Sequence, residues 1–271
     1  MEIKDCVVLL AGLGTRCYPF SYTVPKCMIP VVNKPVIEYI VEELMLSGIE
    51  NIYFVLPKYQ NSKICLKHFK QNKKILKLLK QKNSPYYQKM IARKFPKIIP
   101  VYCKSPNGSG GALLECEKYL KNKTFAVVNS DEIFVGDIPA VKELIDCVKK
   151  INCCAVSYNI TDISQAYKYG MIKTKQNKNE EILLKLIEKP KNNKKLTKFV
   201  VGRYILNYKI FDILKKTPKV NGEIYITTAI DKFAQDNKVI CKYLSSKRYD
   251  CGCAEGIVKA NVELISYKDK I

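Results

Sequence analysis

Short apolar runs alternate along the chain with longer segments in which apolar residues recur at helical spacing. The apolar runs predict buried strands, which in the first half are Val7–Leu10, Ile52–Leu56, Ile98–Tyr102, Phe125–Val128 and Cys153–Tyr158. Helices are predicted between them, at Val36–Leu46, within Lys63–Lys97, from the glycine loop Asn107–Gly111 to about Leu120, and at Ala140–Lys150. This order predicts an α/β fold with a mostly parallel sheet and helices on both of its faces.

The second half of the chain has a more mixed pattern. Its predicted elements are a hairpin of Tyr169–Thr174 and Leu183–Ile187, strands at Phe199–Leu206 and Val239–Leu244, and helices at Tyr208–Lys216 and Thr227–Gln235. No clear linker or repeat divides the 271 residues, so we expect a single domain over residues 1–271.

The loop after the first predicted strand is the most informative segment. Val7–Leu10 leads into Ala11-Gly12-Leu13-Gly14-Thr15-Arg16, where glycines let backbone N–H groups approach a phosphate and arginine adds a positive charge. Lys26 supplies a second cation ten residues later. Cys17 replaces the third glycine of a dinucleotide fingerprint, and no Walker Gly-Lys-Ser/Thr follows. The segment predicts a polyphosphate site, with a ligand-free turn as the alternative.

Two carboxylates in distant segments are candidate metal ligands. Asp131 ends an apolar strand, and Asp250 follows the last predicted strand. Ligands of α/β sheets bind beyond the carboxyl ends of the strands, so the Gly12 loop, the Gly108 loop and Asp131 are expected on one rim. Mg²⁺ suits one or two carboxylates combined with substrate oxygens. The alternatives are a helix cap or turn for Asp131 and an ordinary turn for Asp250.

Polar and glycine residues also mark the ends of strands in the second half. Glu188-Lys189-Pro190 follows an apolar strand that proline would stop, leaving a carboxylate and an ammonium at its end. Such a pair can grip a sugar hydroxyl and a phosphate, although a surface strand end is the simpler interpretation. Gly170 and Gly202 lie near strand ends, where a sugar ring could pack on the backbone; a bulge or turn is the alternative.

The formal net charge of +22 is compatible with nucleic-acid binding, but most of the basic residues are lysines, which makes this function less favoured. Only four of the 47 basic residues are arginines, whereas base and phosphate readers favour arginine forks. The densest lysine region, Lys63–Lys97, is typical of amphipathic helices with a solvated face. We therefore expect no nucleic-acid partner, with a nonspecific anion-attracting surface as the alternative.

Bulk properties favour a cytoplasmic protein without a membrane partner. No apolar run reaches the roughly 18 residues of a membrane span, and the N-terminus does not resemble a signal peptide. The twelve cysteines include no pair of CxxC motifs, so reduced and mostly buried thiols are expected instead of disulfides or a zinc site.

The order of the short motifs adds a resemblance. GLGTR, PK, PNGSGG, SD, YG, EKP, VGRY, NGE and YDCG together resemble the sugar-phosphate nucleotidylyltransferases, and more narrowly the bacterial-type UTP–glucose-1-phosphate uridylyltransferases, over about residues 3–265. The resemblance implies a Rossmann-like core with a nucleotide-binding part at about 1–135 and a sugar-binding part at about 136–271. It also implies Mg²⁺, a homodimer or homotetramer, and transfer of a uridylyl group from UTP to α-D-glucose 1-phosphate.

The resemblance implies roles for individual residues. Arg16 would bind the departing phosphates, Lys26 the α-phosphate and the sugar phosphate, and Lys189 the sugar phosphate. Asp131 and Asp250 would hold the metal. The implied nucleotide-binding residues are Leu10, Ala11, Gly12, Gly14, Thr15, Cys103 and Gly108, and the implied hexose-binding residues are Gly170, Glu188 and Gly202.

Four positions depart from the pattern of the uridylyltransferases. Cys103 stands where the family usually has a glutamine whose amide reads the pyrimidine, and cysteine cannot make that paired contact. Tyr22 replaces a usual lysine, Cys27 a usual glutamate and Asn107 a usual lysine. Two alternatives therefore remain: a glucose-1-phosphate thymidylyltransferase and a catalytically weak paralogue that binds sugar nucleotides.

Overall fold

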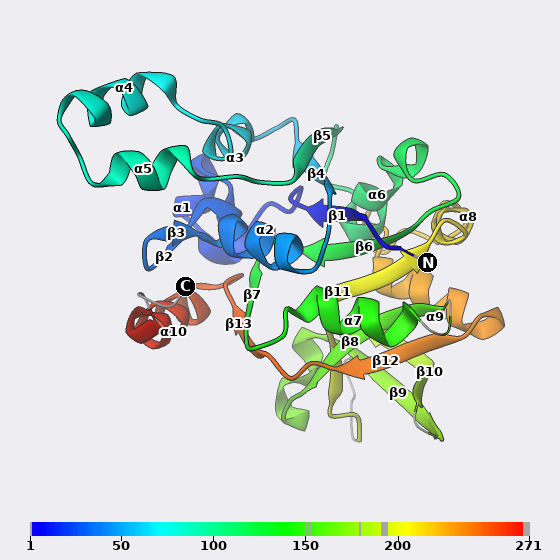
Figure 1. Cartoon of the computed structure of the whole chain (residues 1–271). Helices are drawn as coiled ribbons and strands as arrows, with labels where there is room; N and C mark the ends of the chain where they lie inside the picture. Colours follow the sequence, from blue (N-terminus) through cyan, green and yellow to red (C-terminus); the bar gives the residue numbers. More distant parts are fainter. Residues whose placement is uncertain (1, 150, 152, 179, 191–194, 268–271) are drawn as a thin grey trace.

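A nine-stranded sheet forms the centre of the computed structural model, which describes residues 2–149, 151, 153–178, 180–190 and 195–267 (Figure 1). In spatial order its strands are β5 (Lys97–Cys103), β4 (Asn51–Pro57), β1 (Asp5–Leu9), β6 (Thr124–Asn129), β11 (Lys198–Asn207), β8 (Cys154–Ile160), β12 (Val239–Tyr243), β10 (Glu180–Glu188) and β9 (Gly170–Asn177).

The sheet has a parallel half and a mixed half. β5, β4, β1 and β6 are parallel neighbours, as the alternation of strands and helices predicted. β11 enters antiparallel between β6 and β8, and β9 and β10 form the predicted antiparallel hairpin. β12 is parallel to β8 and antiparallel to β10. Parallel pairing therefore dominates only in the half that carries the glycine loop.

Helices cover both faces of the sheet, so successive residues of its strands are buried on opposite sides. In β1, Cys6 and Val8 belong to one apolar cluster, whereas Val7 and Leu9 belong to another. The first cluster is closed by α2 (Val36–Leu46), α7 (Ala140–Lys149) and α10 (Ala254–Leu264). The second is closed by α6 (Gly108–Leu114), α8 (Ile210–Lys215) and α9 (Ile226–Asp236).

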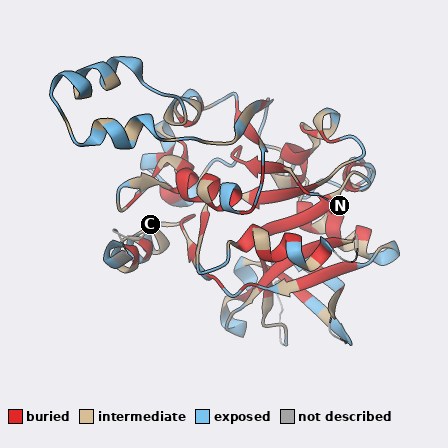
Figure 2. Cartoon of the chain, in the orientation of Figure 1, coloured by how far each residue is buried: buried red, intermediate tan, exposed pale blue. Residues whose placement is uncertain are grey.

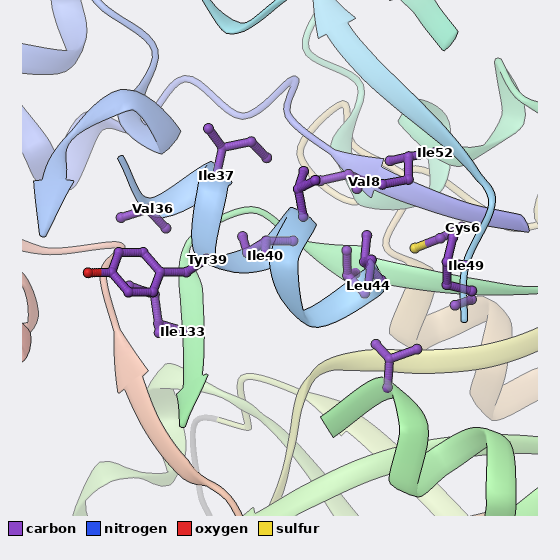
Figure 3. Packing of buried hydrophobic residues seen from close by; sticks show 14 of the residues in the cluster. Cys6, Val8, Val36, Ile37, Tyr39, Ile40, Leu44, Ile49, Ile52 and Ile133 are labelled. Atoms are coloured by element: carbon purple, nitrogen blue, oxygen red, sulfur yellow. The ribbon is translucent and has the colours of Figure 1, made fainter. Parts of the chain in front are cut away.

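Helix α2 illustrates how the apolar pattern specifies an element. Ile37, Ile40 and Leu44 recur at helical spacing and lie in one cluster with Val8 and Ile52 of the strands (Figure 3). The helix begins after proline, which lacks an N–H donor, and ends just before a glycine at positive φ. Its observed bounds match the predicted ones.

The lysine-rich segment forms three short helices, of which the last two extend from the body of the molecule (Figure 1). The three are α3 (Lys63–His68), α4 (Lys73–Gln81) and α5 (Tyr86–Ile91). Neither α4 nor α5 contains a buried residue (Figure 2). Ile75 and Leu78 remain about half exposed. The predicted amphipathic helices are present. Helix α3 packs on the core through Cys65, whereas the apolar side chains of α4 and α5 contribute little to it.

Several details differ from the expectations. Gly108 to Gly111 form the first turn of α6 instead of a separate loop, and that helix ends at Leu114, well before the predicted Leu120. The pattern also missed short elements, which are α1 (Phe20–Thr23), the β2–β3 pair (Pro30–Val31 with Lys34–Pro35), and the pair formed by β7 (Glu132–Val135) and β13 (Lys247–Asp250).

Two bulk expectations can be compared with the structure. Nine of the twelve cysteines are buried, which confirms the expectation of mostly buried thiols. Among the described residues, none of the helices has the length and apolar character needed to cross a bilayer.

Candidate active site

The glycine loop after β1 is folded closely onto Lys26. Gly14 adopts φ 69°, in the left-handed region that favours glycine, and caps a 3₁₀ turn at Thr15–Cys17. A Cβ at Gly14 would lie 3.1 Å from Cβ of Lys26 and 3.3 Å from Cβ of Ser21. The Ser21 hydroxyl donates to the Gly14 carbonyl oxygen at 2.7 Å, which holds the loop in place. A larger residue at position 14 would therefore displace the loop or Lys26.

Lys26 and Asp131 form an ion pair at the carboxyl end of β6. Lys26 Nζ lies 2.5 Å from Asp131 Oδ2, and each side chain is only 16% exposed. Burial disfavours both charges, but the mutual attraction and the hydrogen bond outweigh it, so the pKa of Lys26 is raised and the pKa of Asp131 is lowered. Both groups are consequently charged at neutral pH.

The β7–β13 ladder brings Asp250 beside Asp131. Glu132 of β7 is paired with Asp250 of β13, and the Cys251 N–H donates to the Asp131 carbonyl oxygen at 2.7 Å. Gly252 lies among the charged groups, because a Cβ there would be 2.6 Å from Arg16 Nη2, 2.8 Å from Asp131 Oδ2 and 3.0 Å from Asp250 Oδ1. We call Arg16, Lys26, Asp131 and Asp250 the charged cluster. It joins segments that are more than 200 residues apart.

Glu132 and Arg248 support this cluster, although the sequence analysis did not select them as site residues. Arg248 forms an ion pair with Glu132 Oε1, and its Nη2 donates to Asp250 Oδ2 at 3.1 Å. The Gly202 N–H donates to Glu132 Oε2 at 2.6 Å. Burial disfavours the Arg248 cation, but Glu132 and Asp250 raise its pKa. The orientation of Asp250 is thus determined by an arginine that stays charged.

Two adjoining cavities meet at the charged cluster. The first, of about 370 Å³, is lined by six predicted residues of the nucleotide side and by Asp131; the six are Ala11, Gly12, Gly14, Thr15, Lys26 and Gly108. The second, of about 550 Å³, is lined by Arg16, Asp131, Gly170, Glu188, Lys189, Gly202 and Asp250. Ser109, Asn129 and Asp131 line both cavities, so one continuous cleft contains most of the predicted site residues.

Glu188 occupies the far side of the second cavity. Its Oε2 accepts a hydrogen bond from the Thr227 hydroxyl at 2.8 Å, and a Cβ at Gly170 would lie 3.1 Å from the same oxygen. The Lys189 side chain is less constrained than that of Glu188. It is 55% exposed, and its Nζ lies 3.8 Å from Glu188 Oε1. A carboxylate and an ammonium are therefore available side by side at the end of β10.

Leu10 and Cys103 lie in the protein interior beside the first cavity. Leu10 is 3% exposed, and its N–H donates to the Val55 carbonyl oxygen at 3.0 Å. Cys103 is fully buried at the end of β5, and burial raises the pKa of its thiol. The thiol faces the Ser105 carbonyl oxygen at 2.9 Å and Asn107 Oδ1 at 3.4 Å. Neither residue lines the first cavity; Cys103 contacts it only through Asn107, which does line it.

Glu223 is a further candidate; it belongs to the NGE motif but was not among the predicted site residues. It lines the first cavity together with Asn107 and Gly108. The link between the two segments is a backbone contact, since the Ile224 N–H donates to the Asn107 carbonyl oxygen at 2.9 Å. The acidic residue directly after Asn-Gly was the available signal, but no local pattern indicates that this turn meets α6.

The described residues include no group of three or more His, Cys, Asp or Glu side chains that could hold a metal ion without help. Asp131 and Asp250 are nevertheless close enough to approach the same Gly252 position. Two carboxylates fit a hard cation that takes its remaining ligands from phosphate oxygens and water. The donor set is therefore suited to Mg²⁺ in the presence of a phosphate substrate.

Comparison with known proteins agrees with this arrangement. The model of the family described as nucleotidyl transferase matches residues 5–266. A UTP–glucose-1-phosphate uridylyltransferase from Mycoplasma genitalium is 32% identical over 268 residues, covering 96% of this chain and 91% of that protein. An apo UDP-glucose pyrophosphorylase has a TM-score of 0.88 at 31% identity, and a UDP-glucose pyrophosphorylase complexed with UDP-glucose has 0.85 at 32%; each comparison covers 100% of both chains. The chain belongs to the nucleotidyl transferase family.

Proposed function

We propose that the protein transfers the uridylyl group of UTP to α-D-glucose 1-phosphate, forming UDP-glucose and pyrophosphate. The observation that carries the proposal is the charged cluster at the junction of two cavities. One cavity adjoins a glycine loop suited to phosphates, and the other contains Glu188 and Lys189. The name of the Mycoplasma relative and the structural likeness to a complex with UDP-glucose support the choice of substrates.

The reaction needs positioning and charge neutralisation more than proton transfer. A phosphate oxygen of glucose 1-phosphate attacks the α-phosphorus of UTP, and the bond from that phosphorus to the bridging oxygen of the β-phosphate breaks. The electron pair leaves with pyrophosphate, and the attacking oxygen is already anionic, so no general base is required. Residues that hold the two phosphates in line and offset their charge therefore account for catalysis.

In this proposal the two cations of the charged cluster, Lys26 and Arg16, bind different phosphates. Lys26 leaves its ion pair with Asp131 to bind the α-phosphate and the sugar phosphate, while Arg16 binds the departing pyrophosphate. Arg16 lies in the 3₁₀ turn that Gly14 caps, and Lys26 packs against Gly14. The glycine loop therefore positions both cations. Backbone N–H groups around Gly12 and Gly14 would complete the phosphate site.

Asp131 and Asp250 are the proposed ligands of Mg²⁺. A bound Mg²⁺ neutralises phosphate charge and orients phosphate oxygens. Lys26 and Arg248 form ion pairs with these two carboxylates, and this contact with cations supports the proposal that they bind a metal ion. Glu188 and Gly170 would hold the hexose, and Lys189 its phosphate.

A substrate panel tests the proposal. Pyrophosphate release should require glucose 1-phosphate, Mg²⁺ and a pyrimidine nucleoside triphosphate, and kcat/KM should be highest with UTP. A preference for dTTP would make the protein a thymidylyltransferase instead. Binding of UDP-glucose without any pyrophosphate release would identify a sugar-nucleotide-binding paralogue with little or no catalytic activity.

The close packing at Gly252 gives a second test. Gly252→Ala should lower kcat at least about tenfold, because its Cβ would displace Arg16 or the carboxylates, and small misplacements of reacting groups are costly. Glu255→Ala, an exposed change three residues away, should leave kcat within about twofold of the unmodified protein. Normal turnover of Gly252→Ala would show that the cluster does not act on the substrate in this arrangement.

A further inference from the structure

The residues that line the first cavity differ in type from one end of the sheet's rim to the other. Asp131 follows β6 and the glycine loop follows β1, whereas Asn107 follows β5, two strands beyond β1 in the spatial order β5-β4-β1-β6. Lys26 and Asp131 therefore lie at the β1–β6 side of the cavity, whereas Glu223 lines it beside Gly108. At the β5 side its lining includes Pro106, Asn107, Gly108 and Ala112, which are uncharged and suited to contact a planar base.

Asn107 carries the carboxamide on this part of the wall. Its side chain lies over the first turn of α6, because a Cβ at Gly111 would come within 2.7 Å of both Oδ1 and Nδ2. The thiol of Cys103 contacts Oδ1 at 3.4 Å, and the Asn107 carbonyl oxygen accepts from the Ile224 N–H at 2.9 Å. Backbone and side chain are thus both held, and within the described part of the chain Nδ2 donates no hydrogen bond.

A carboxamide has the hydrogen-bonding groups that a uracil edge requires. It offers one N–H donor and one C=O acceptor, which can pair with a uracil carbonyl and with N3–H. Cysteine at position 103 cannot form this pair, and its fully buried thiol is already directed at Ser105 and Asn107. Cys103 therefore has the geometry of a positioning residue behind Asn107.

We propose that the carboxamide of Asn107 reads the N3 edge of the pyrimidine, and that Cys103 positions it. This assignment rests on the proposed use of UTP and identifies the residue that selects the base. Gly111 is also needed for this arrangement, since any larger residue there would occupy the space of the Asn107 carboxamide. The departures at positions 103 and 107 are then linked, because the reading group has moved from one position to the other.

Asn107→Asp is the discriminating variant, because it keeps the shape and replaces the N–H donor with a second acceptor. A carboxylate repels the uracil carbonyl but can accept from the amino group of cytosine. The ratio of kcat/KM for UTP to that for CTP should fall at least about tenfold. The ratio for UTP to dTTP should stay within about threefold, because uracil and thymine share this edge. If the added negative charge of Asn107→Asp weakened the binding of all nucleotides equally, neither ratio of kcat/KM would change.

Matched variants separate base reading from general damage. Ser105→Ala keeps the carbonyl oxygen that faces the Cys103 thiol and should leave both ratios unchanged. Cys103→Ala and Gly111→Ala retain Asn107 but disturb its placement, so each should lower the UTP to CTP ratio without adding charge. Cys103→Ser, which keeps a donor, should restore most of the ratio lost in Cys103→Ala. If Asn107→Asp does not fold, the variants at Cys103 and Gly111 still test the role of Asn107.

The outcomes distinguish the two proposals. An unchanged UTP to CTP ratio in Asn107→Asp, with wild-type turnover of UTP, would overturn the role of Asn107 and leave the proposed function intact. If the wild-type protein releases no pyrophosphate, dissociation constants for UTP and CTP replace kcat/KM. A rise in the ratio of the dissociation constant for UTP to that for CTP in Asn107→Asp would then support Asn107 as the base reader while the proposed activity fails, and an unchanged ratio would overturn both.

Discussion

Asp131→Asn is expected to lower kcat by more than about 100-fold, the size of loss that follows removal of one charge-stabilising group. Asparagine preserves the shape of the side chain but removes the negative charge that pairs with Lys26 Nζ at 2.5 Å and that we assign to Mg²⁺. The KM for UTP should change less than kcat, because the glycine loop and Arg16 remain. Pyrophosphate release under saturating substrates measures the effect.

A carboxylate elsewhere on the surface supplies the control for this experiment. Asp212→Asn removes the same charge from a side chain that is 68% exposed and should leave kcat within about twofold. Thermal unfolding of both variants separates loss of chemistry from loss of fold. Near-normal turnover of Asp131→Asn would mean that the metal and phosphate site has been placed wrongly.

Arg203→Met is expected to reduce the free energy of unfolding by about 3–5 kcal/mol, because it leaves a buried carboxylate without its partner. Arg203 is fully buried, and its Nε and Nη2 donate to the two carboxylate oxygens of Glu43 at 2.9 and 2.7 Å. Nη2 also donates to the Glu132 carbonyl oxygen at 3.0 Å. Urea unfolding followed by circular dichroism measures the change.

The double variant Arg203→Met/Glu43→Met tests the physical reason. Replacing both charges with apolar groups removes the unpaired carboxylate, so the double variant should be more stable than Arg203→Met alone. A loss below about 1 kcal/mol for Arg203→Met would contradict the buried ion pair as a major contribution, since exposed pairs contribute that little.

Local patterns were sufficient for most of the elements and for the family. The strand before the glycine loop, helix α2 and the β9–β10 hairpin were all predicted near their observed bounds, because each carries its own periodicity and end signals. The expected α/β fold and nucleotidyltransferase family are confirmed by the family match over residues 5–266 and by the solved structures.

Pairings between distant segments were harder to predict. The antiparallel entry of β11 between β6 and β8 depends on which strand edge is free, and no local pattern contains that information. The β7–β13 pair joins two four-residue strands that are more than 100 residues apart, yet it is the pair that sets Asp250 beside Asp131. The sequence indicated both carboxylates but not the ladder that aligns them.

Gly202 lies in the middle of β11, not near a strand end as expected, and the residue that follows it has a different function. Gly202 lines the second cavity, whereas the next residue, Arg203, points to the opposite side of β11 and pairs with Glu43. The VGRY motif therefore combines a cavity residue with a buried ion pair. Likewise Cys103 and Leu10, which the resemblance placed at the nucleotide, are buried, and neither lines the first cavity.

Diffraction from crystals grown with UDP-glucose and Mn²⁺ in place of Mg²⁺ would test the central claim most directly, because anomalous scattering locates the ion without assumptions about the protein. The account predicts one anomalous peak between the carboxylates of Asp131 and Asp250, with the diphosphate of UDP-glucose within reach of Lys26 and Arg16. A metal bound elsewhere, or a diphosphate away from these four residues, would contradict it.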